Sequence, residues 1–202
     1  MGISPRQFEE LKKRVGGAKR SADPVFPSSF SAAPAKHQVI LGIDPSLRGT
    51  GFGIIRLARR VPELVAQGTI KCPPALERSR CLVKIVEDLR GVIGKHRPTV
   101  CVIEALFYAQ NLQTALLMGE ARGASLVAAA EAGLEIFEVA PRKVKQAIVG
   151  YGAAQKSAVA KMVQHMLRLA EPPAPDAADA LALALTHAQE GAGLSLNPPR
   201  RI

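Results

Sequence analysis

The stretch QVILGIDPSLRGTGFGIIRL, residues 38–57, decides the fold of this chain. Residues 39–43 are apolar and rich in β-branched side chains, so we predict a short strand that is buried on both faces. Pro45 ends this strand, and residues 54–57 resume an extended pattern after a loop that contains glycines. The segment is therefore predicted to form a strand, a loop and a returning strand.

Asp44 stands at the end of the first predicted strand. A buried carboxylate there needs a cation, hydrogen-bond donors or a proton, because an unpaired buried charge is costly. The glycines of GTGFG, residues 49–53, superficially resemble a dinucleotide-binding loop. That fingerprint requires GxGxxG at the start of a helix, whereas a strand follows here, so we set the nucleotide interpretation aside.

Composition narrows the class of protein. The 202 residues are 48% hydrophobic and carry a formal net charge of +10, with a sequence pI near 10.0. This balance suits one ordinary core and favours a polyanionic partner such as nucleic acid. No run approaches the roughly 18 apolar residues of a membrane span, and no signal-peptide pattern opens the chain, so we expect a cytoplasmic protein without membrane contact.

The cysteines and histidines suggest no catalytic or metal site. Cys72, Cys81 and Cys101 show neither CxxC nor Cys/His spacing, so we predict reduced, structural thiols. The four histidines show no spacing that would support a Ser/His or Cys/His nucleophile.

Three regions differ in composition. Residues 1–37 form a basic extension, rich in Ser, Ala and Pro, that we predict to be largely disordered apart from a short helix within residues 4–17. Residues 38–190 carry the periodic apolar patterns of a folded domain, and residues 191–202 are predicted to be a tail.

The domain is predicted to be an α/β fold with a five-stranded mixed sheet, an antiparallel meander plus two parallel strands, flanked by helices. After the first two strands, further strands are predicted at residues 63–70, 100–103 and 134–139. Helices are predicted at residues 76–95, 112–132, 156–169 and 176–189, with a short basic helix that starts at Pro141.

Four acidic residues fall at the ends of predicted core elements. Glu104 ends its strand as Asp44 ends the first one, and parallel pairing would bring both to the edge where open α/β sheets place ligands. Asp176 and Asp179 lie three apart, about 5–6 Å between Cβ atoms on one helical face. Acids at a helix start are also favoured by the helix dipole alone. This helix is apolar almost all round, however, so two bare charges on it call for a divalent ion.

Carboxylates without His or Cys partners select Mg²⁺ or Mn²⁺. The four acids would suit a site with two ions about 3.5–4 Å apart that hydrolyses phosphodiesters. A carboxylate pair could instead perform the acid–base chemistry of a glycosidase, but neutral sugars do not explain a basic protein.

The whole pattern resembles the RuvC family, the Holliday-junction resolvases of bacteria in the RNase H-like superfamily. The resemblance covers nearly all of residues 38–189, in the family's order. The motifs that carry it are LGIDP, VIE followed by Phe107 and Asn111, the ARG of the long helix, VKQAIVGYGAAQKS and DAADALALALTH.

The resemblance implies an RNase H-like fold and a Mg²⁺-dependent endonuclease, with two ions per site and Mn²⁺ as a substitute. Its metal-binding catalytic acids would be Asp44, Glu104, Asp176 and Asp179. Lys145 and Lys156 would lie near the scissile DNA strands, and Phe107 would contact or unstack bases. A homodimer that nicks four-way junction DNA symmetrically, with RuvA and RuvB as branch-migration partners, is also implied.

Three positions depart from the family's usual residues: Ser46 stands for Gly, Phe52 for Tyr and Ala105 for a frequent Gln. Other functions stay open on the residues alone. They are an RNase H-like nuclease acting on RNA in hybrids, a catalytically silent junction-binding module and an actin-like ATPase, for which the chain is short.

Overall fold

The computed structural model describes residues 38–58, 61–106, 112–191 and 199–202. The predicted extension, residues 1–37, and Phe107 lie outside the described residues. The strands are β1 (Val39–Asp44), β2 (Gly49–Ala58), β3 (Val61–Lys71), β4 (Val100–Glu104), β5 (Glu135–Val139) and β6 (Arg200–Arg201). The helices are α2 (Arg78–His96), α3 (Leu112–Glu131), α4 (Pro141–Val149), α5 (Lys156–Met166) and α6 (Pro175–Gly191).

One mixed sheet in the order β3-β2-β1-β4-β5-β6 organises the described part of the chain. β1, β2 and β3 form an antiparallel meander, and β4 and β5 run parallel to β1. The predicted combination of a meander and two parallel strands is confirmed. The 19-residue helix α2 makes the crossover from the meander to β4, as parallel pairing requires.

The predicted count of five strands is wrong, because the sheet has six. Arg200 and Arg201 lie in the region predicted to be a tail, yet they pair antiparallel with Glu138 and Phe137 of β5. Two residues carry no apolar alternation from which a strand could be predicted. Their pairing comes from the backbone of β5, and Arg201 also lies 3.1 Å from the carboxylate of Glu135.

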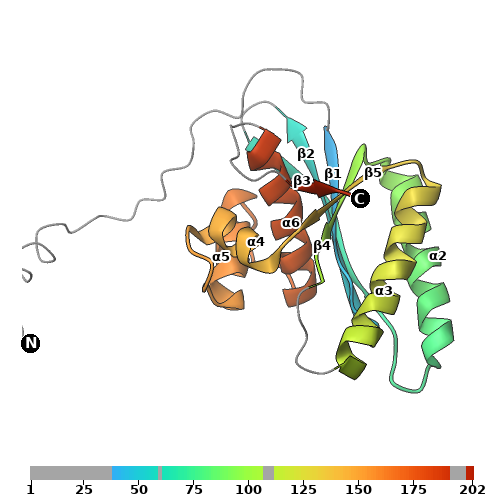
Figure 1. Ribbon diagram of the computed structural model, residues 1–202. Coiled ribbons are helices and arrows are strands. Elements are labelled where there is room, and N and C mark those ends of the chain that lie inside the picture. The colour runs from blue at the N-terminus through green and yellow to red at the C-terminus, as the bar shows by residue number, and fades with distance from the viewer. Residues whose placement is uncertain (1–37, 59–60, 107–111, 192–198) are drawn as a thin grey trace, which may run out of the picture.

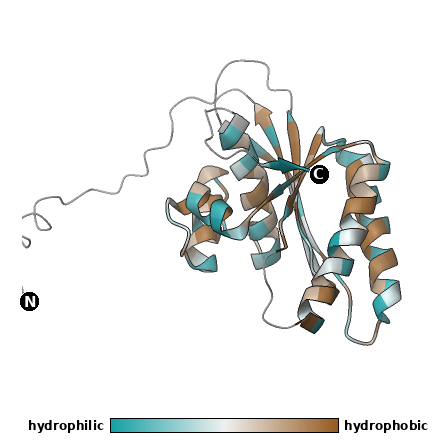
Figure 2. Cartoon of the chain, in the orientation of Figure 1, coloured by the Kyte–Doolittle hydropathy of each residue, from teal (hydrophilic) through white to brown (hydrophobic). Residues whose placement is uncertain are grey.

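The sheet separates two layers of helices (Figure 1). α2 and α3 cover one face, while α4, α5 and α6 cover the other. Side chains alternate along β1: Ile40 packs with the α6 layer, whereas Leu41 and Ile43 pack with the α2 layer. Both faces of the central strands therefore carry apolar side chains, and Figure 2 shows brown, hydrophobic segments along these strands.

α6 lies directly on glycines of β1 and β2. Gly42 and Gly53 are paired in register, and a Cβ atom on Gly42 would come within 1.9 Å of the Ala180 carbonyl oxygen of α6. A Cβ on Gly51 would lie 2.0 Å from the Asp176 carbonyl oxygen. The glycines at 49, 51 and 53, predicted to lie in a loop, instead belong to β2, and Gly42, Gly51 and Gly53 make room for a helix backbone.

Cys72, Cys81 and Cys101 are buried and form no disulfide, in agreement with the prediction of structural thiols. Within the described ranges, no helix has the length and apolar character needed to cross a bilayer.

We predict that Gly42→Ala destabilises the protein by about 2–3 kcal/mol, because the added methyl group must displace the backbone of α6. Gly91→Ala is the matched control: Gly91 lies in the interior of α2, and a Cβ atom added there would have nothing within 4 Å, so this change is expected to stabilise by about 0.5–1 kcal/mol. Urea unfolding of both variants measures the two effects. Equal stability of Gly42→Ala and the wild type would contradict the close contact.

Candidate active site

Asp44 and Glu104 end two neighbouring parallel strands. β1 and β4 pair with Ile43 opposite Ile103, so the two acids come next in the same register. Because side chains alternate along a strand, Asp44 points to the same face as Gly42, the face that α6 covers. A hydrogen bond joins the Asp44 and Glu104 side chains. The first two predicted acids are therefore direct neighbours.

α6 brings the other two acids to the same edge of the sheet. A Cβ on Gly49 would lie 3.1 Å from Oδ2 of Asp176, so this carboxylate rests against the start of β2. Asp179 lies one helical turn further on, and its side chain is 22% exposed. The negative charges of both aspartates act on Asp44. Residues from β1, β4 and α6 thus form one acidic cluster, as predicted.

The two lysines that were predicted to contact DNA lie next to this cluster. The ammonium group of Lys156, at the start of α5, donates to Oδ2 of Asp179 at 2.7 Å. Its side chain is 76% exposed, so the contact can open toward solvent. Lys145, from α4, is close enough for its charge to lower the pKa of Glu104. The structure therefore places both lysines beside the acids.

Burial and mutual repulsion change the protonation of the strand-end acids. Burial, followed by the negative charge of Glu104, raises the pKa of Asp44 from 3.8 to about 8. Burial and the charge of Asp179 also raise the pKa of Glu104. The raised pKa of Asp44 favours its protonated form, which is able to donate a hydrogen bond to Glu104. The hydrogen bond from Lys156 to Asp179 raises the pKa of that lysine.

The donor set fits a hard divalent cation. Carboxylate oxygens crowded at one edge, with raised pKa values, are groups that a cation would return to their charged forms. In the described part of the chain, no three His, Cys, Asp or Glu side chains are gathered closely enough to bind a metal ion as they stand. The ammonium group of Lys156, which pairs with Asp179, partly neutralises the cluster.

Two residues that support the loop after Asp44 were missed from the sequence. Thr50 is fully buried, and its hydroxyl donates to the Ser46 carbonyl oxygen at 2.7 Å. The guanidinium group of Arg48 donates to the carbonyl oxygens of Pro73 and Leu76, at 2.8 and 2.9 Å. A threonine within a glycine-rich stretch was the available signal for the first, and no local pattern indicated the second.

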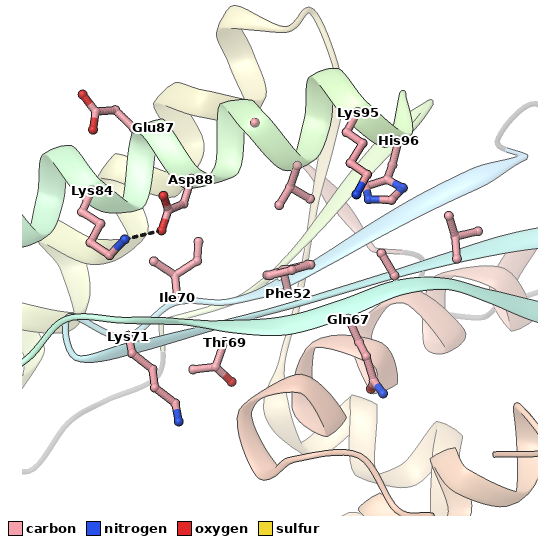
Figure 3. A pocket seen from close by; sticks show the side chains of 14 residues that line it. Phe52, Gln67, Thr69, Ile70, Lys71, Lys84, Glu87, Asp88, Lys95 and His96 are labelled. Carbon is pink, nitrogen blue, oxygen red and sulfur yellow. Dashed lines mark hydrogen bonds and ion pairs between the residues drawn. The ribbon is translucent and has the colours of Figure 1, made fainter. Parts of the chain in front are cut away.

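A surface groove lies away from the acids (Figure 3). It has a volume of about 860 Å³ and runs between α2 and the edge strand β3. Lys84 and Asp88 pair at 2.7 Å on its helical side, and Gln67 and Thr69 come from β3. None of the four acids lines it, so the chemistry that the acids support is located away from this groove.

We predict that the stability advantage of Asp44→Asn over the wild type grows with pH in EDTA. The folded-state pKa of Asp44, about 8, lies above its ordinary value of 3.8, so the folded state binds the extra proton between these limits. The contribution of Asp44 to wild-type stability therefore falls as pH rises from about 4 to about 8, and the neutral amide avoids this loss. Melting temperatures of both proteins across this range provide the measurement. A constant difference would contradict the raised pKa.

Comparisons with known proteins agree with this architecture. The family model described as "Crossover junction endodeoxyribonuclease RuvC" matches residues 40–187. A protein of that name from Chromohalobacter salexigens is 44% identical over 162 residues, 80% of this chain and 87% of the relative. One from Akkermansia muciniphila is 45% identical over 148 residues, 73% of this chain and 89% of the relative.

Solved structures show the same similarity. The structure described as T. thermophilus RuvC in complex with Holliday junction substrate has a TM-score of 0.75 and 34% sequence identity, and the match covers 82% of this chain and 100% of that chain. A family model that spans the whole sheet core, together with relatives at this identity, leads to one conclusion. The chain belongs to the RuvC family of crossover junction endodeoxyribonucleases.

Proposed function

We propose that this protein is a Mg²⁺-dependent endodeoxyribonuclease with an RNase H-like fold that resolves four-way DNA junctions in recombination and repair. The observation that carries the proposal is the convergence of Asp44, Glu104, Asp176 and Asp179 from three separate elements on one edge of the sheet. The relatives' name and the junction substrate of the T. thermophilus structure support the same reaction and substrate.

In this proposal the four carboxylates hold two Mg²⁺ ions, with Mn²⁺ as a substitute. The ions, when bound, supply Lewis-acid stabilisation of the scissile phosphate and activate the attacking water. Asp44 and Glu104 would bind the ions from the ends of β1 and β4. Asp176 and Asp179 complete the ligand set from α6, whose position on the glycine face sets their distance from the strands. Metal binding requires Asp44 to release its proton and Lys156 to leave Asp179.

Lys156 and Lys145 have a second role in the proposed reaction. If Asp179 held a cation, the flexible and exposed side chain of Lys156 would be available to a DNA phosphate next to the cut bond. Lys145 adds positive charge on the α4 side of the acids. Together with a formal net charge of +10, these lysines would attract the DNA backbone toward a site that is itself acidic.

Symmetric cleavage of a junction requires two active sites, so we propose a homodimer. The surface that supports it lies on the outer side of α2 and α3, where an apolar groove of about 560 Å³ includes Val83 and Val127, 46% and 48% exposed. Ion pairs between Arg78 and Glu120 and between Arg90 and Glu131 connect the same two helices. An apolar centre with polar surroundings is the usual composition of a protein interface. By family resemblance, RuvA and RuvB are further proposed partners, and the cytoplasm is the proposed location.

We predict that Asp44→Asn binds an immobile four-way junction with an affinity within about threefold of the wild type, while the cleavage rate falls at least about 10³-fold. The amide keeps the shape of the side chain but removes one charged metal ligand. A labelled junction, incubated with and without Mg²⁺, measures cleavage, and gel-shift titration in EDTA measures binding. Cleavage by Asp44→Asn at the wild-type rate would contradict the assignment.

The same assay separates the other candidate functions. An RNA–DNA hybrid offered beside the junction detects an RNase H-like preference for RNA. Binding without product at any Mg²⁺ or Mn²⁺ concentration would instead identify a silent junction-binding module.

We predict that Val127→Glu separates the proposed homodimer into monomers, because a charge in the apolar groove opposes its burial. The monomer should make single nicks rather than pairs on opposite strands. Ile202→Glu is the matched control, since this apolar side chain is 46% exposed and does not line the groove. Sedimentation equilibrium measures the mass of both variants. A dimeric Val127→Glu would exclude this groove as the interface.

A further inference from the structure

Arg122 of α3 joins three elements at the end of β4. Its Nε donates to the carbonyl oxygen of Glu104 at 3.3 Å, and its Nη2 donates to Oε2 of Glu138 in β5 at 2.8 Å. The side chains of Arg122 and Glu138 are only 15% and 20% exposed. This guanidinium therefore holds the backbone of one proposed metal ligand and the side chain of the neighbouring strand at the same time.

The contact acts on the peptide unit after Glu104, which β5 holds from its other side. Glu104 is the last residue of β4, and the following amide, of Ala105, still donates to Val139 of β5 at 2.9 Å. The Glu104 carbonyl oxygen accepts from Arg122 of α3, 18 residues further along the chain. A charged donor forms a stronger hydrogen bond than a neutral one, so Arg122 restrains the peptide plane after Glu104. The direction of the Glu104 side chain depends on that plane.

Arginine is suited to this double contact. Its planar fork presents Nε and Nη2 as donors at a fixed angle, whereas the three donors of a lysine share one nitrogen at the end of a flexible stem. Glu138 balances the charge of Arg122, so the effect on Glu104 comes mainly from orientation. The other cation near Glu138, Arg200, lies 3.7 Å away, is 80% exposed and reaches that carboxylate through Oε1.

We propose that Arg122 is a positioning residue that orients Glu104 for divalent-cation binding by holding its carbonyl oxygen against α3. This inference rests on the proposed function, in which Glu104 is a metal ligand. It gives a role to the arginine of the ARG motif, which composition and spacing left without one. Residues that orient metal ligands typically change metal affinity or activity by about 10–100-fold when they are replaced.

The test compares Arg122→Gln with the wild type, both as full chains. Calorimetric titration with Mg²⁺ in the absence of DNA measures metal affinity directly, and Mg²⁺ titration of junction cleavage measures the half-saturating concentration. Both are expected to shift by about tenfold toward weaker binding. Cleavage should recover in part at high Mg²⁺, while junction affinity in EDTA stays within about twofold. An unchanged Mg²⁺ affinity with only a lower melting temperature would overturn the proposal.

Arg200→Gln is the matched control, because it removes the other arginine near Glu138 and does not touch Glu104. Its Mg²⁺ affinity should equal that of the wild type. A shift equal to that of Arg122→Gln would mean that the charge near Glu138 matters rather than the contact with Glu104, and would also overturn the proposal.

Arg122→Lys serves if the glutamine variant does not fold. A lysine is expected to keep the pair with Glu138, since the carboxylate is the stronger acceptor, and to leave the Glu104 carbonyl without its donor. It should therefore retain stability but show the weaker Mg²⁺ binding. Wild-type Mg²⁺ affinity in a folded Arg122→Lys would overturn the proposal.

A wild type that binds Mg²⁺ but cuts no junction would refute the proposed function, while the calorimetric comparison would still decide the role of Arg122.

Discussion

The contact between α6 and the glycine face of β1 and β2 is the constraint on which the site depends. Side chains normally separate the backbone of a helix from that of a sheet, but here the backbone of α6 meets strand positions that have no room for a Cβ atom. Gly51, which is opposite Asp44 in the sheet, lies directly under Asp176. The close approach brings the two acids of α6 near the two acids at the strand ends.

This arrangement has a cost in stability that is consistent with a functional site. Four carboxylates at one edge repel one another, and partial burial raises the pKa values of Asp44 and Glu104. A structural core would avoid such a cluster, because removing charge from it would stabilise the fold. Here the ammonium group of Lys156, which donates to Asp179, reduces the repulsion. The Lys156 side chain is exposed, so this contact can open toward solvent.

The strand-end acids could be predicted from the sequence because each ends a short apolar run, and such runs place their last residue at the edge of a parallel sheet. Asp176 and Asp179 could be placed on one helical face by their spacing. Arg122, Arg48 and Thr50 could not be found in this way. Their roles depend on atoms 4 to 28 residues away, mostly on backbone carbonyl oxygens, which look alike in every sequence.

The sequence by itself determined the meander, the parallel strands and the acids that end them, since apolar periodicity and strand-breaking residues are local properties. Tertiary structure alone decided three further features: the sixth strand, the close approach of α6 to the sheet and the hydrogen bond from Arg122 of α3 to Glu104. Each depends on contacts between elements that are distant in the sequence. β6 forms because β5 offers a free edge, and α6 approaches because Gly42 and Gly53 are paired in register. These long-range contacts cannot be predicted from local sequence patterns, because the residues involved are brought together only by packing of the whole chain.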